Sequence, residues 1–143
     1  MSDSIATVLD SLSAAWASQL TGVNVFSGPV GVEEAGLECV AFGNGKLVET
    51  NLAGGGVQEE TWTIGGEVRV VRSWQGSTEQ TIAAARTRAE TIWATVATSI
   101  NDTYIGQLPH VDVTGGEILS NFVAEGRECR RSFELTIQIV TNP

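Results

Sequence analysis

Two stretches of the chain carry apolar residues at spacings of three and four, the pattern of a helix with one buried face. The first runs from Asp3 to Leu20 and is followed by Gly22, a residue type that commonly ends helices. The second begins at Ser77, which with Gln80 has the spacing of a capping box, and extends for about 24 residues to Asn101-Asp102. The predicted buried stripes are Ile5, Val8, Leu9, Leu12, Trp16 and Leu20, and Ile82, Ala85, Ala89, Ile92, Trp93, Val96 and Ile100.

Short extended segments bounded by turn residues lie between these helices. Val23 to Phe26 is followed by Ser27-Gly28-Pro29, and Leu37 to Phe42 is closed by Gly43-Asn44-Gly45. Glu59 to Trp74 is predicted to be a strand pair or one bulged strand. Its Gly65-Gly66 is compatible with either a hairpin turn or a bulge, so both remain open.

The C-terminal third predicts a β-hairpin. Val111 to Val113 and Ile118 to Ala124 are extended, and Glu125-Gly126-Arg127 has turn chemistry. Glu128 to Val140 is the clearest strand, in which apolar and polar residues alternate over 132–139. Such alternation is typical of an antiparallel strand with one covered face. We therefore expect an α+β fold, a single mixed or antiparallel sheet with two main helices packed on one face.

The 143 residues fit one domain, predicted to span residues 1–143. Residues 43–58 have the fewest structural signals and include Gly54-Gly55-Gly56, which predicts a loop that is mobile or binds a partner. Leu47, Val48 and Leu52 are apolar residues within this loop-like segment. Burial against a neighbouring subunit or against their own domain would explain them equally well.

The net charge of the chain argues against some classes of binding partner. Asp and Glu total 17 and Lys and Arg total 8, giving a net charge of −9, which argues against sequence-specific DNA binding and against an anionic membrane surface. The polar start and the lack of a long apolar run predict no signal peptide and no membrane span. We expect a soluble protein made in the cytosol. Cys39 and Cys129 could form one disulfide, but a cytosolic origin favours two reduced core residues.

Residues suited to catalysis or metal binding are sparse. His110 is the only histidine, no metal-binding motif is present, and the adjacent pairs Glu33-Glu34 and Glu59-Glu60 point to opposite faces if extended. The three consecutive glycines lack the spacing of a phosphate-binding loop. The sequence thus predicts no enzyme, no cofactor and no metal, and favours binding or assembly.

Arg127, Arg130 and Arg131 form the one basic cluster. Pairing with carboxylates across the sheet is one interpretation, and an interface with a partner subunit is the other, because arginine is favoured at interfaces. For the four tryptophans, Trp16, Trp62, Trp74 and Trp93, the expectation is core packing.

The order and spacing of these elements resemble the tail terminator proteins of long-tailed, lambda-type bacteriophages. An amphipathic N-terminal helix leads into a short strand ending at Gly28-Pro29, a segment near Leu37 to Phe42, a long strand from Thr61 to Trp74, a capped helix from Ser77 and two closing strands. The stretch Asn101 to Gly106 is similar to a turn of that family, with Asp102 where a proline often stands.

The resemblance implies a structural virion protein with no catalytic residues, located at the head-proximal end of the tail. It implies a hexameric ring that caps the tail tube, stops its polymerisation and docks the head-completion protein. Double-stranded DNA would pass through the lumen without specific binding, and Glu33 and Glu34 are candidates for an acidic lumen. The alternatives are another head–tail connector or tail-completion protein, and a cytosolic α+β domain that binds a small molecule.

Overall fold

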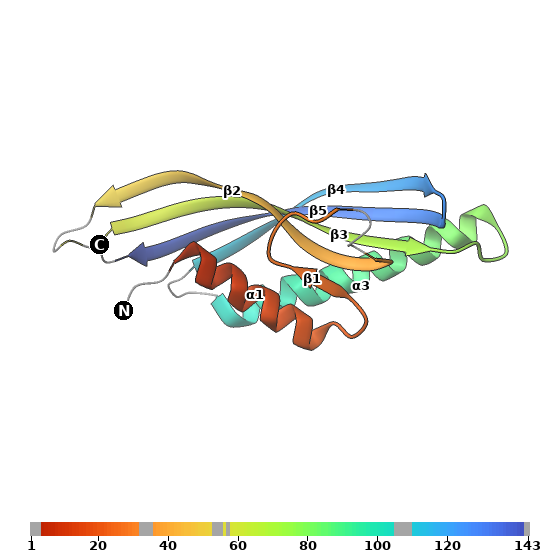
Figure 1. The fold of residues 1–143 in the computed structure, drawn as a ribbon, viewed down its shortest axis with the longest axis horizontal. Helices are drawn as coiled ribbons and strands as arrows, with labels where there is room; N and C mark the ends of the chain where they lie inside the picture. Colours follow the sequence, from red (N-terminus) through yellow and green to blue (C-terminus); the bar gives the residue numbers. More distant parts are fainter. Residues whose placement is uncertain (1–3, 32–35, 53–55, 57, 105–109, 142–143) are drawn as a thin grey trace.

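The computed structural model describes residues 4–31, 36–52, 56, 58–104 and 110–141. In these segments five strands form one mixed sheet, and two helices lie on the same side of it (Figure 1). The strand order is β1-β2-β3-β5-β4, with β1 parallel to β2 and every other neighbouring pair antiparallel. The predicted fold class is therefore confirmed.

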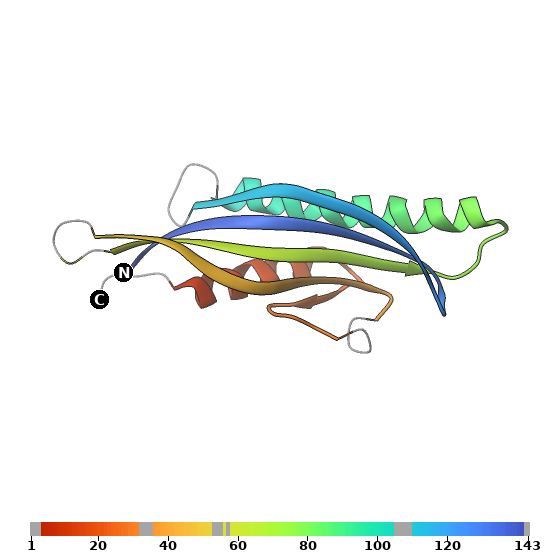
Figure 2. The same ribbon diagram turned by 90° about the horizontal axis from the view of Figure 1, so that it is seen from above.

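The helices begin and end near their predicted limits. Helix α1 spans Ile5–Gln19, and its N-cap residue Ser4 accepts a hydrogen bond from the backbone N–H of Thr7. Helix α3 spans Thr78–Tyr104, and Ser77 caps it by accepting from the backbone N–H of Gln80 at 3.1 Å. Seen from above, α3 runs along the β4 side of the sheet and α1 along the β2 side (Figure 2).

The core fills the space between this helix layer and the sheet. Trp16 of α1 is fully buried, with its ring centroid 5.0 Å from that of Phe42 and 6.2 Å from that of Phe133. Trp93 of α3 lies 5.4 Å from Phe133 on the other side. These aromatic contacts join both helices to the middle of the sheet, because Phe42 belongs to β2 and Phe133 to β5. The face of the sheet turned away from α1 and α3 is called the helix-free face below.

The strands are longer than the sequence pattern predicts. Strand β1 spans Asn24–Phe26, β2 spans Glu38–Leu52, β3 spans Gln58–Arg72, β4 spans His110–Val123 and β5 spans Gly126–Thr141. The predicted loop over 43–58 is thus wrong for residues 43–52, which continue β2 and pair with β3. Residues 53–55 and 57 lie outside the described residues. Backbone pairing with β3 stabilises this segment despite its weak local signals.

Gly65-Gly66 forms neither a turn nor a bulge of its own strand. β3 passes through both residues in regular register with β5, and the irregularity lies in the facing part of β2, between Phe42 and Gly45. A side chain at Gly66 would overlap the Phe133 ring, so the ring occupies the space above this glycine. The glycine therefore serves packing across the sheet rather than chain reversal.

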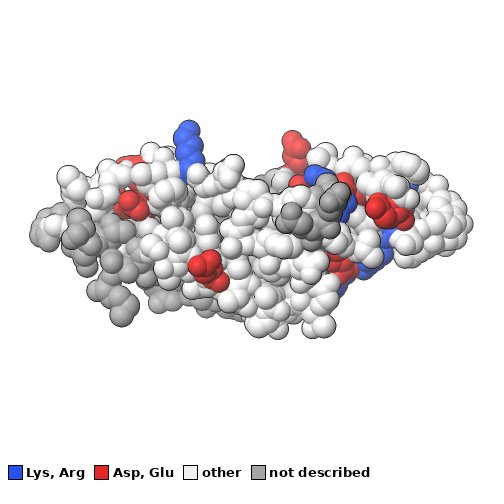
Figure 3. Space-filling model, viewed as in Figure 1, with Lys and Arg blue, Asp and Glu red and all other residues white. Residues whose placement is uncertain are grey.

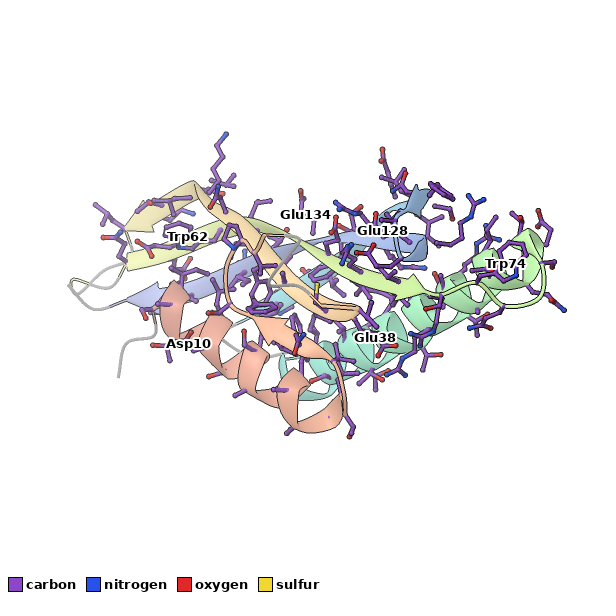
Figure 4. All side chains as sticks on the ribbon, turned by 45° about the vertical axis from the view of Figure 1, so that its right-hand side comes forward. Asp10, Glu38, Trp62, Trp74, Glu128 and Glu134 are labelled. Atoms are coloured by element: carbon purple, nitrogen blue, oxygen red, sulfur yellow. The ribbon has the colours of Figure 1, made fainter. Side chains whose placement is uncertain are left out.

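Trp74 contradicts the expectation of core packing. Its side chain is 63 % exposed, beyond the end of β3 and beside the start of α3 (Figure 4). The alternation that predicted burial continues past Arg72, where the strand ends and the sheet no longer offers a covered face. Trp62 and Trp93 are partly buried and pack against the core, as expected.

Candidate functional site

Two long strands have an open edge in the described part of the sheet, β4 and the outer part of β2. Among the described residues, β4 pairs only with β5, so its outer edge (residues 110–123, the β4 edge) is free along its length. On the opposite side, β1 covers only Cys39 to Ala41 of β2, which leaves the rest of that strand (residues 43–52, the β2 edge) without an outer neighbour in the described part of the chain. Free backbone groups along such edges can pair with a strand of another chain.

The three apolar residues singled out in the sequence lie on the β2 edge. Leu47, Val48 and Leu52 are 42 %, 57 % and 82 % exposed, so their own domain leaves much of each side chain uncovered. The sequence analysis missed three matching residues on the β4 edge, namely Ile118, Leu119 and Phe122, which are also exposed. Their alternating pattern predicted a strand, but it carries no information about which strand lies at an edge.

Arg127 is the second residue of β5, next to the turn that joins β4 to β5. Its guanidinium carbon is 5.0 Å from the centroid of the Phe122 ring, a cation–π geometry. Together with Trp74 and Thr81, these residues line a cavity of about 210 Å³ that is open at the tip of the molecule. Arg127 makes no ion pair with a carboxylate among the described residues.

Arg130 belongs to a buried charge cluster on the helix-free face. Glu128 accepts from Arg69 Nε at 2.5 Å and from Arg130 Nε at 2.8 Å, and Asn121 Nδ2 donates to it at 3.1 Å. Burial alone would raise the pKa of Glu128, but its hydrogen bonds from Arg130, Arg69 and Asn121 outweigh burial and lower that pKa. Pairing with carboxylates, the first interpretation of the sequence, thus accounts for Arg130.

Arg131 points to the opposite face, as strand alternation predicts. Its guanidinium forms an ion pair with Glu90 of α3 and stacks 4.8 Å from the centroid of the Trp93 ring. These contacts attach β5 to the helix layer. Arg130 and Arg131 therefore have carboxylate partners within the chain, whereas Arg127 has none among the described residues.

Carboxylates of β3, β4 and β5 lie on the helix-free face of the sheet. The pair predicted to line an acidic lumen, Glu33 and Glu34, lies outside the described residues. In Figure 4, Glu134 stands on the side of the sheet away from α1. The pairing of β3, β4 and β5 places further hydroxyl, amide and carboxylate side chains on the same side of the sheet as Glu134. These residues are Glu59, Thr61, Thr63, Asp112, Thr114, Thr136 and Gln138. In the view of Figure 3, basic side chains gather mainly over one half of the molecule, whereas acidic ones are scattered along its length.

Glu38 holds a second charge cluster between β2 and α3. It accepts from Arg72 Nη2 at 2.5 Å and from Arg88 Nε and Nη2 at 3.0 and 3.1 Å. Burial opposes ionisation of Glu38, but the hydrogen bonds and positive charges of Arg88 and Arg72 outweigh it and hold its pKa below the usual 4.5.

Acidification is therefore expected to destabilise the protein through Glu38 and Glu128. Both pKa values are lowered in the folded state, so the unfolded chain takes up protons first as the pH falls below about 5. The free energy of unfolding that these two carboxylates contribute is therefore fully present near neutral pH and decreases toward acid pH. Urea unfolding at pH values from 7 to 3 measures this slope. Glu38→Gln should flatten it, because a glutamine does not titrate and this contribution to the slope is lost. An unchanged slope in Glu38→Gln would contradict this assignment.

The histidine and the two cysteines occupy separate places in the described structure. His110 contacts Asp112 at 3.0 Å on the surface, and no cluster of three potential metal ligands occurs in the described residues. Cys39 and Cys129 are free and buried, as expected, and burial raises the pKa of both thiols. Cys129 belongs to the core between sheet and helices, whereas Cys39 lines a cavity of about 360 Å³ on the helix-free face.

Comparison with known proteins assigns no family to the chain, because no protein-family model and no curated protein matches it. No described helix is both long and apolar enough to cross a membrane. The stretch that resembles the family turn, residues 101–106, enters α3 as far as Tyr104, and its last two residues lie outside the described residues.

Proposed function

We propose that this protein is a phage tail terminator, a structural protein of which six copies form a ring at the head-proximal end of a tail tube. The observation that carries the proposal is a sheet with helices on one side only and a different open strand at each edge. Two non-equivalent edges favour a head-to-tail contact between copies, and head-to-tail contacts close into rings when the rotation between copies is suitable.

The dimensions agree with such a ring. Each copy has four long strands, β2 to β5, in the described part of the chain. Six copies joined side by side would give a circle of strands about 115 Å around at a spacing of about 4.8 Å, hence about 37 Å across, and strand tilt widens it further. The opening would be wider than a DNA duplex.

The helix-free face suits the lumen of this ring. It bears carboxylates and neutral hydroxyl and amide groups, including Asp112, Glu134 and Thr136. Six copies carry a formal charge of −54, so phosphates would be repelled rather than bound. We propose that DNA passes without specific contacts, and that the major tail tube protein and the head-completion protein bind the two rims.

Negative-stain electron microscopy with native mass measurement tests the proposal, followed by assembly with the tail tube protein of the same virus. We expect six-fold rings with a central hole, on the protein alone or at tube ends, and tubes that stop growing when this protein is added. Tubes whose length distribution is the same with and without an excess of the protein would contradict the function.

The second candidate, a small-molecule-binding domain, is favoured by the cavity of about 360 Å³ on the helix-free face. Its size falls within the range of ligand sites, and Arg69, Arg130 and Glu67 offer it polar groups. All three charges are already engaged with one another or with Glu128. A metabolite library that shifts the melting temperature of a monomer without rings would favour this candidate over the terminator.

A further inference from the structure

We propose that the β4 edge of one copy pairs antiparallel with the β2 edge of the next copy, joining their sheets in one defined register. This inference rests on the proposed ring and names the contact that would build it. It follows from four features of the two edges, which are the exposed side chains, the strand directions, the limit set by β1 and the position of the bulges.

Exposed apolar side chains concentrate on these two strands. Of the eight large hydrophobic side chains that are exposed in the described residues, six lie on β2 or β4. They are Leu47, Val48 and Leu52 on the β2 edge, and Ile118, Leu119 and Phe122 on the β4 edge. A long edge with apolar side chains invites pairing with another strand, and soluble proteins usually protect it with charge or a covering segment. A second copy of this chain offers the matching cover.

The strand directions fix the sense of pairing. β2 is antiparallel to β3, β3 to β5 and β5 to β4, so β2 and β4 run in opposite directions across one sheet. A neighbour related by rotation about a ring axis presents its β4 in this same opposite direction. The contact is therefore antiparallel, continuing the pattern within each copy.

β1 limits how far the two strands overlap. It pairs with Cys39 to Ala41 of β2 and occupies the outer side of that segment. The incoming β4 ends at Val123, which can thus reach no further than Phe42. We take this largest overlap, with Val123 opposite Phe42, as the register.

In this register, apolar side chains of the outer part of β2 meet apolar side chains of β4. Counting along the antiparallel strands places Ile118 opposite Leu47 and Val113 opposite Leu52. Within each copy all four lie on the helix side of the sheet, since Leu47 pairs with Trp62, Val113 packs against the core and Ile118 lies opposite Arg131. A shift by one residue would set the apolar side of one strand against the polar side of the other.

One bulge of each edge coincides in this register, whereas the second bulge of β2, between Phe42 and Gly45, faces a regular part of β4. β2 carries one extra residue relative to β3 between Leu47 and Glu49, and β4 carries one relative to β5 between Gly115 and Ile118. The same register brings Val48 opposite Glu117, so the irregularities face each other. Strands that bend at matching positions can pair on both sides of the bend.

A mixing experiment tests the two-edge contact. Leu119→Lys places a charge on the β4 edge, opposite Lys46 in this register, and Val48→Glu places one on the β2 edge, opposite Glu117. Both sites are exposed, so folding should be unaffected. Each variant alone should assemble only at concentrations at least about tenfold higher than the unchanged protein, but the two mixed should form one-to-one dimers through their remaining intact edges. Ala94→Lys, on the exposed side of α3, is the matched control and should assemble normally.

Cross-linking tests the register. Ile118→Cys in one copy and Leu47→Cys in another should form a disulfide on mixing under mild oxidation, because opposed residues bring the sulfurs within reach. Ile118→Cys mixed with Leu52→Cys should not, since Leu52 is about 17 Å further along the strand. Cys39 and Cys129 are buried and stay in both chains. Equal cross-linking of both pairs, or none at the highest attainable concentration, overturns the register.

The results distinguish a wrong contact between copies from a wrong function of the protein. If the Leu119→Lys and Val48→Glu variants assemble rings like the unchanged protein, or their mixture gives no dimers, the contact is wrong although the protein still caps tubes. If the dimers and the Ile118–Leu47 cross-link form but tube length is unaffected, the contact stands and the terminator function is wrong.

Discussion

Glu128→Ala is expected to destabilise the protein by about 3–5 kcal/mol, because it leaves the buried guanidinium of Arg69 without its carboxylate. Arg69 and Glu128 are 6 % and 3 % exposed, and their ion pair is 2.5 Å long. The second nitrogen of Arg69 is held by the backbone carbonyl of Gly36 at 2.9 Å, so the charge has little freedom to turn toward water. Chemical unfolding at pH 7, followed by circular dichroism, measures the loss.

Two comparisons isolate the cause of this loss. The double variant Arg69→Met with Glu128→Leu removes both charges and should recover most of the stability, since apolar residues of similar size often replace a buried ion pair at little cost. Glu134→Ala on the same strand removes an exposed carboxylate and should change stability by no more than about 0.5 kcal/mol. A loss in Glu128→Ala as small as that in Glu134→Ala would show that the pair is dispensable.

Gly66→Ala is expected to cost about 1–3 kcal/mol, because the new methyl group would overlap the Phe133 ring. Phe133 is buried and contacts Trp16 and Trp93, so displacing it disturbs both helix contacts at once. We expect a lower denaturant midpoint and a changed tryptophan fluorescence spectrum in the folded state.

The neighbouring glycine provides the control. A methyl group at Gly65 meets nothing within 4 Å, so Gly65→Ala should be neutral or stabilise by about 0.4–1 kcal/mol through the unfolded chain. Gly66→Ala combined with Phe133→Leu should be less destabilised than the sum of the two single changes, because the smaller side chain leaves room for the methyl group. Equal effects of Ala at both glycines would contradict the packing role of Gly66.

Local periodicity was sufficient to predict the helices, the β4–β5 hairpin and the fold class. Helix α1 and strand β5 each bury one regular face, so their apolar spacing reports the geometry directly. Residues 43–52 were not predicted as a strand because β2 is bulged twice there, is exposed at most positions and lacks an outer neighbour in the described residues. Its pairing with β3 is a long-range interaction that no local pattern contains.

Some exposed apolar residues of the two edges could be identified from the sequence, and others could not. Leu47, Val48 and Leu52 were recognisable as apolar residues without an evident core role, and the structure leaves them exposed. Ile118 and Phe122 looked like ordinary strand residues, since edge and central strands share one alternation. Trp74 looked buried for the same reason, because the alternation continued beyond the end of the strand.

The sequence by itself determined the two amphipathic helices, the strand segments, the acidic charge and the scarcity of catalytic groups, because each depends on composition or on neighbours a few residues apart. Only the tertiary structure decided that β4 and the outer half of β2 are the open edges, that Arg130 and Arg131 have partners within the chain, and that Phe133 fills the space above Gly66. These properties depend on strand order and on contacts between residues far apart in the chain, which periodicity does not encode.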